Sequence, residues 1–237
     1  MKRFLYFLIS GLMFTTVAGC KKINGKGDTI TETRTVGNYN SIGLSISGTV
    51  NFRQDSVYSL SVIAQENLFP YIETYVDDNT LVIKIKDHYT LGSHDPITIN
   101  LTAPSVNDLD ISGSGDINTS GPWTVSQASL NISGSGNFNI DTLATSSLKA
   151  NISGSGIVNV AKGVASTATL VISGSGSIKT QYVMTNTVNA TISGSGDIYC
   201  WTVDLLVATI SGSGNIYYNG NPQVEAHISG SGTVRKL

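Results

Sequence analysis

The amino-acid sequence predicts an all-β protein, built as a parallel β-helix-like solenoid with coils of 18 to 21 residues. Three observations support this fold class. One pentapeptide recurs at an almost constant interval, apolar and polar residues alternate around each copy, and no apolar stripe of helical period appears. The composition agrees, because 25 glycines and a charged fraction of only 13% suit coils that expose columns of small polar side chains.

Composition and charge exclude several classes of protein. With 40% hydrophobic residues the chain of 237 residues can bury a core, which excludes a disordered tail. The 14 basic residues do not exceed the 16 acidic ones, so the bulk charge required for binding nucleic acid is missing. Two cysteines cannot form a disulfide scaffold. A folded domain with an uncharged polar surface remains.

The N-terminus has the pattern of a lipoprotein signal peptide, which we assign to residues 1–19. Two basic residues precede a mostly apolar run over residues 4–17, which is too short to span a bilayer. Val-Ala-Gly-Cys at 17–20 resembles a bacterial lipobox, in which the cysteine thiol receives the lipid. We therefore expect lipidation of Cys20 and anchoring in the cell envelope, at the outer membrane, on either its periplasmic or its outer face.

Residues 20–107 precede the regular repeats. Residues 20–28 are expected to form a flexible, lipid-anchored tether. Residues 29–107 lack the pentapeptide but contain short alternating segments, such as residues 42–46 and 50–52. We expect them to form either irregular early coils or a β-rich cap that covers the first edge of the solenoid.

Residues 108–237 contain the repeat Ile-Ser-Gly-Ser-Gly. Successive copies are separated by 21, 20, 20, 20, 18 and 18 residues. Seven copies at this spacing indicate a stacked architecture. The isoleucines that begin the copies are Ile111, Ile132, Ile152, Ile172, Ile192, Ile210 and Ile228.

The alternation around each repeat predicts which side chains form the core. Positions two before each isoleucine are all Leu or Ala, and positions six after it are all Ile, Val or Phe. Successive strand residues face opposite sides, so this parity points inward and the serines point outward. The glycines fit a tight corner or a close approach to the opposite wall. Ile132 and Ile152 are then expected to lie one rung apart.

The lipobox, the strand-rich lead-in and the repeated Ile-Ser-Gly-Ser-Gly resemble the family called putative auto-transporter adhesin, head GIN domain, found in exported lipoproteins of Bacteroidetes. The resemblance covers roughly residues 35–235. It implies a right-handed solenoid and an exported location. The adhesin label implies binding without an established ligand.

The sequence offers little for catalysis or metal binding. Asp87, His88, His94 and Asp95 share one polar loop, where a zinc site is conceivable but a solvated loop is far commoner. The repeated serines have no base beside them in the sequence, and no cofactor motif is present. We expect no enzyme activity, no bound metal and no cofactor.

One outward column, seven residues after each isoleucine, is the candidate partner surface. Its first half is a ladder of asparagines, expected to be structural. Its second half contains Tyr199 and Tyr217, with Trp201 and Tyr218 nearby, whereas Cys200 has inward parity. Exposed aromatic rings can stack on sugars or meet a partner protein, but covering the C-terminal coils or forming a contact between subunits is the commoner role. The column comprises Asn118, Asn139, Asn159, Lys179, Tyr199, Tyr217 and Arg235.

Taken together, these patterns predict a non-enzymatic, lipid-anchored envelope solenoid that acts as an adhesin or surface scaffold. The expected partners are the membrane, through the lipid, and a glycan or an envelope protein. A carbohydrate-binding module that uses the tyrosines is the alternative, and a polysaccharide-acting enzyme is a distant third.

Overall fold

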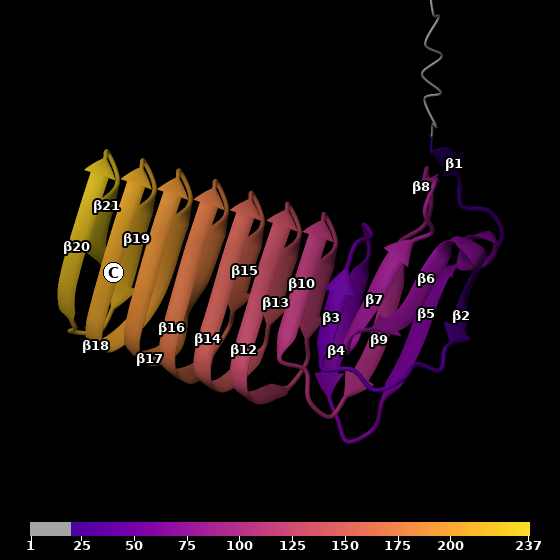
Figure 1. Cartoon of the computed structure of the whole chain (residues 1–237), viewed down its shortest axis with the longest axis horizontal. Helices are drawn as coiled ribbons and strands as arrows, with labels where there is room; N and C mark the ends of the chain where they lie inside the picture. Colours follow the sequence, from indigo (N-terminus) through magenta and orange to yellow (C-terminus); the bar gives the residue numbers. More distant parts are fainter. Residues whose placement is uncertain (1–19) are drawn as a thin grey trace, which may run out of the picture.

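A computed structural model describes residues 20–237 and confirms the all-β solenoid (Figure 1). Its coils have about 20 residues each, and strands make up 70% of the protein. The predicted signal peptide, residues 1–19, lies outside the described residues. No helix within residues 20–237 is long and apolar enough to cross a bilayer.

Each regular coil consists of one long strand, a corner, and one short strand. β12 (Pro122–Gly134) and β14 (Thr142–Gly154) are long strands, and β13 (Asn137–Ile140) and β15 (Ile157–Val160) are the short strands that follow them. All pairs between coils are parallel, and Ile132 pairs with Ile152 as predicted. The other strands of this region are β10 (Asp108–Gly113), β11 (Asp116–Thr119), β16 (Gly163–Gly174), β17 (Ser177–Gly194), β18 (Asp197–Gly212), β19 (Asn215–Asn219), β20 (Gln223–Gly230) and β21 (Thr233–Lys236).

The core consists of stacked columns of apolar side chains. The first six repeat isoleucines are at most 2% exposed, and each such burial stabilises the fold by roughly 1.5–3 kcal/mol. Large and small residues alternate along a column: Ala150 lies between Leu130 and Leu170, and in the neighbouring column Leu148 lies between Ala128 and Ala168. This alternation keeps the core volume constant from coil to coil. The last coil is different: Ile228 is 45% exposed at the open end.

The glycines make the corner compact by close approach to the preceding coil. Gly134 has a φ of +137°, and a Cβ there would overlap the carbonyl oxygen of Gly113. The same oxygen accepts hydrogen bonds from the backbone N–H groups of Ser135 and Gly136, at 2.9 and 3.0 Å. The expected approach to the opposite wall is therefore wrong, since the crowding atoms belong to the coil before.

Two further coils precede β10 without the pentapeptide. They are formed by β3 (Ser41–Leu44) with β4 (Thr49–Gln54), and by β7 (Thr80–Ile85) with β9 (Thr98–Ala103). β3 lies between β10 and β7, and β4 lies between β11 and β9, all in parallel register. The solenoid thus begins well before the first Ile-Ser-Gly-Ser-Gly.

An antiparallel cap covers the first edge. β5 (Ser59–Gln65) pairs with β9, β2 (Thr29–Thr33) pairs with β5, and β6 (Ile72–Asp77) pairs with β7, all antiparallel. The short 3-10 helix η1 (Glu66–Tyr71) joins β5 to β6. Arg34 ties the cap together, donating to Glu32 and to the backbone oxygen of Ile72 at 2.6 Å each. Residues 29–107 therefore combine the two expected arrangements, early coils and a cap.

The expected flexible tether is wrong, because the segment after Cys20 is folded against the protein. β1 (Lys21–Ile23) pairs in parallel with β8 (Tyr89–Leu91). The Lys21 N–H donates to the His88 oxygen at 2.8 Å, and the Gly25 N–H donates to the Ser93 oxygen at 2.9 Å. The partner loop lies more than sixty residues away in sequence, so no local pattern around Cys20 indicates this docking.

Candidate functional site

The short strands present one outward column along the length of the solenoid. Its first half is an amide ladder: Asn139 donates to Asn118 at 2.9 Å, Asn118 to Asn51 at 3.3 Å, and Asn51 to Asn100 at 3.0 Å. The ladder therefore continues into the early coils, beyond the predicted members. Strand register gives the full column as Asn100, Asn51, Asn118, Asn139, Asn159, Lys179, Tyr199, Tyr217 and Arg235.

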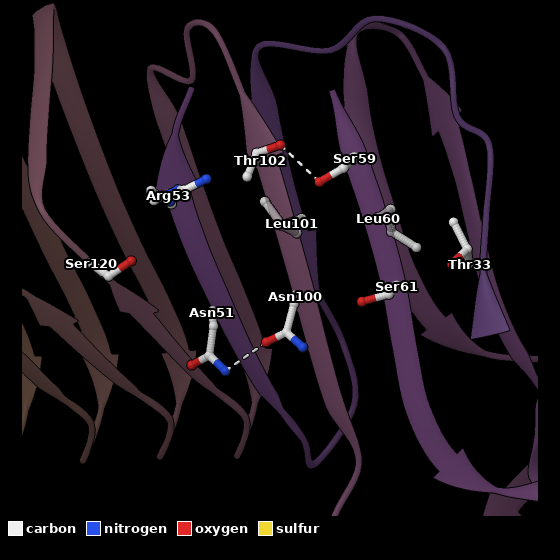
Figure 2. A pocket seen from close by; sticks show the side chains of 10 residues that line it. All are labelled: Thr33, Asn51, Arg53, Ser59, Leu60, Ser61, Asn100, Leu101, Thr102 and Ser120. Atoms are coloured by element: carbon white, nitrogen blue, oxygen red, sulfur yellow. Dashed lines mark hydrogen bonds between the residues drawn. The ribbon is translucent and has the colours of Figure 1, made fainter. Parts of the chain in front are cut away.

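A shallow depression of about 410 Å³ lies at the cap end of this column. Figure 2 shows its polar side chains, with Asn51 hydrogen-bonded to Asn100 and Ser59 to Thr102. The Thr102 hydroxyl donates to the Val57 oxygen at 2.6 Å, and Arg53 pairs with Asp55 at 2.7 Å. The residues that line the depression include no His, Asp, Glu, Cys or Lys, so no general base lies among its hydroxyl groups.

At the other end of the column, Tyr199 and Tyr217 stack on each other. Their ring centroids are 4.8 Å apart and their planes differ by 14°. This separation is the spacing of adjacent strands, so the stacking follows from the in-register coils. Partial burial is the main cause that raises the pKa of Tyr199, and the nearby charges of Asp197 and ionised Tyr217 raise it further. Since the two rings face one another, they offer outward mainly their edges and hydroxyl groups.

Beside this pair, a bulge in β17 exposes further apolar side chains. Thr180 pairs with Cys200 and Met184 with Trp201, so the intervening residues bulge from the ladder. Tyr182, within the bulge, is 61% exposed, and Met184, which pairs with Trp201 at the end of the bulge, is 44% exposed. Trp201, Tyr199 and Tyr217 are half-buried, and we call these three residues together with the exposed Tyr182 and Met184 the aromatic patch.

Tyr218 and Cys200 lie apart from this surface. Tyr218 is half-buried and packs against the core. Cys200 is 1% exposed, and burial raises the pKa of its thiol to about 12. Cys20, in contrast, is exposed at the start of β1. The two cysteines therefore have opposite reactivity.

The polar loop with two histidines does not assemble into a ligand cluster. Asp87 pairs with Lys84 at 2.9 Å, and Asp95 accepts a hydrogen bond from the Thr29 hydroxyl at 3.1 Å. His94 Nδ1 lies 2.6 Å from the Asp95 backbone oxygen. Within residues 20–237 there is no group of three or more His, Cys, Asp or Glu arranged to hold a metal ion.

Comparison with known families agrees with this geometry. A sequence profile of the family described as "Putative auto-transporter adhesin, head GIN domain" matches residues 38–222. The chain belongs to this family. No match was found among curated proteins.

Several solved structures are similar to this head GIN domain. A putative adhesin from Bacteroides fragilis is 27% identical with a TM-score of 0.85, over 91% of this chain and 100% of that one. A putative lipid binding protein from Parabacteroides distasonis is 29% identical with a TM-score of 0.76, over 92% and 100% of the two chains. A putative adhesin from the same species, at 24% identity and a TM-score of 0.76 over 92% and 100%, shares the fold. The family fits a non-enzymatic adhesin of the cell envelope.

Sequence reasoning missed two members of the patch in this head GIN domain. Three residues lie between Thr180 and Met184, whereas none lies between their partners Cys200 and Trp201 in the next coil. Tyr182 is the middle one of these three residues, and it is exposed. The signal was available in the shortening of the repeat interval from 20 to 18 residues after Ile192. That change marks the place where the coils no longer match residue for residue.

Proposed function

We propose that this head GIN domain is a non-enzymatic, lipid-anchored adhesin of the bacterial cell envelope, held at the outer membrane through Cys20. The observation that supports it most is the aromatic patch on a rigid, otherwise weakly charged solenoid. An exposed apolar cluster of this kind on a soluble fold marks an interaction surface. The solenoid holds the patch in fixed geometry, which lowers the entropic cost of binding.

The exposed thiol of Cys20 supports the lipid anchor. Its lipobox precedes β1 directly, and Lys21 and Lys22 beside it are exposed to meet anionic headgroups. Growth of the producing bacterium with an alkyne fatty acid should label the wild-type protein. A Cys20→Ser variant should remain unlabelled, and equal labelling of the two proteins would refute the anchor.

A glycan is the second candidate partner, and it is favoured by the composition of the aromatic patch. The exposed ring of Tyr182 and the half-buried ring of Trp201 would stack on the C–H face of a sugar, while the Tyr199 and Tyr217 hydroxyls would supply hydrogen bonds. Arg235 and Lys179 flank the stacked pair in the column. Acidic sugars would meet these cations.

The test is binding to a glycan array and to isolated envelope proteins. We expect the wild type to bind one class, and a Trp201→Ala/Tyr182→Ala variant to lose that binding. Asn159→Ala, in the same column but outside the patch, two coils before Tyr199, serves as the matched control. Retained binding in the patch variant would refute the role of this surface, and turnover of a polysaccharide would refute the non-enzymatic assignment.

A further inference from the structure

The position of Cys20 relative to the coils determines how an anchored molecule faces the membrane. The docking of β1 leaves no flexible segment between Cys20 and the fold, because Lys21 already pairs with Tyr89. A lipid on Cys20 would therefore restrain the orientation of the protein, which a free tether would not do.

The register shows at which corner of the solenoid Cys20 lies. Ile83 aligns with Leu44 and then with Ile111, where the long strands end. Thr98 aligns with Thr49 and then with Asp116, where the short strands begin. Residues 84–97 thus occupy the place that Ser-Gly-Ser-Gly occupies in later coils. β8 lies within this enlarged corner, and β1 pairs with it.

The enlarged corner forms a lobe, which we call the N-terminal lobe (residues 20–26 and 86–96). Figure 1 shows β1 and β8 standing beyond the ends of the long strands, on the side toward which their arrowheads point. That side is the line of Ser-Gly-Ser-Gly corners, which we call the serine corner. Its serines are exposed in every regular coil, for example Ser153 and Ser155.

These positions define a direction. The lobe projects along the strands, whereas coils stack across them at about 4.8 Å each. A bilayer that holds Cys20 therefore lies across the strand ends and along the solenoid axis. The three residues of β1 set the serine corner back from Cys20 by roughly 10 Å.

We propose that the protein lies lengthwise on its membrane, with the serine corner turned toward the lipid headgroups. The proposal rests on the lipid anchor of the proposed function. Charge agrees with it, since the lobe exposes four lysines (Lys21, Lys22, Lys26 and Lys86) against two carboxylates (Asp87 and Asp95), and its excess positive charge attracts anionic headgroups. The aromatic patch, carried by the short strands and the bends beyond them, remains open to the side.

The test uses the chain from Cys20 to Leu237, coupled through the Cys20 thiol to maleimide lipid in phosphatidylethanolamine/phosphatidylglycerol vesicles. Cys200 does not compete, because it is buried and its thiol has a raised pKa. A photo-cross-linking benzophenone amino acid replaces either Ser155, at the serine corner, or Ser146, an exposed serine of the same coil. Ser146 lies seven residues before the corner serine Ser153 in β14, about 23 Å away along the strand.

We expect several-fold more lipid cross-linking at Ser155 than at Ser146. A flexible Gly-Ser linker of about eight residues between Cys20 and Lys21 should abolish that difference. Equal cross-linking without the linker, or more at Ser146, would overturn the proposal. Because the anchor is attached chemically, these outcomes do not depend on lipidation in cells, which the fatty-acid labelling of Cys20→Ser tests separately.

Discussion

A Cβ atom on Gly136 would lie 2.6 Å from the Cγ2 atom of Ile111 in the preceding coil. The same atom would also overlap the backbone oxygen of Gly115, which cannot rotate away. The second glycine of each repeat is therefore required by the spacing of the coils. Its role is steric, since the positive φ belongs to the first glycine of each repeat.

Gly136→Ala should accordingly destabilise the protein by about 1–3 kcal/mol, the usual cost of overpacking. The measurement is the free energy of unfolding in urea. Gly37→Ala is the matched control, because a Cβ there meets nothing within 4 Å and its φ is ordinary. A Gly136→Ala protein as stable as the Gly37→Ala protein would show that the coils can move apart at little cost.

Ala150→Leu tests the alternation of large and small residues in the core. Ala150 is fully buried between Leu130 and Leu170 in register, so the three additional carbons of a leucine must displace packed neighbours. We expect a loss of about 1–3 kcal/mol. Leu148→Ala in the same strand should cost about 2–5 kcal/mol by leaving a cavity.

The double variant Leu148→Ala/Ala150→Leu keeps the residue composition of the coil but reverses its order. If neighbouring coils must interlock, this variant will be no more stable than Ala150→Leu alone. Recovery of wild-type stability would mean that only the total volume of a coil matters. Thermal unfolding followed by circular dichroism distinguishes the two results.

The regular coils were predictable from the sequence because each repeat reports the same local geometry. Ile132 and Ile152 occupy equivalent positions, and their pairing follows from one period and one parity. The docking of β1 was not predictable, because its contacts join residues far apart in sequence. For example, the Ser93 backbone N–H donates a hydrogen bond to the Asn24 side-chain oxygen. The aromatic patch was predicted in part: Tyr199 and Trp201 follow the repeat parity, whereas Tyr182 is exposed by a bulge that breaks it.

Asp110 gives a prediction for pH. Burial is the main cause that raises its pKa above the ordinary 3.8; Asn131, which donates to it at 2.8 Å, lowers the pKa, and Asp108 raises it. The folded state thus binds this proton more tightly than the unfolded state, so the contribution of Asp110 to stability is greatest at low pH. It is lost as pH rises from below 3.8 through the raised value.

Asp110→Asn should therefore raise the melting temperature at pH 7, because an amide oxygen still accepts from Asn131 without a buried charge. The gain should vanish near pH 3, where the native carboxyl is protonated. Asp204→Asn, at an exposed position, is the control that should not alter this pH dependence. A gain in the Asp110→Asn protein that is constant from pH 3 to pH 7 would contradict the role of burial.

The thiols of Cys20 and Cys200 should differ in reactivity, because one is exposed and the other is buried. Cys20 is exposed, whereas Cys200 is 1% exposed and has a pKa of about 12, so it carries almost no thiolate at neutral pH. In the chain from Cys20 to Leu237, a chromogenic disulfide reagent should titrate one thiol in the native protein and two in denaturant. A Cys200→Ala variant should keep the native signal, and Cys20→Ser should abolish it. Rapid modification of the Cys20→Ser protein without denaturant would mean that the last coils open, since Cys200 lies between Thr180 and Tyr218 in their register.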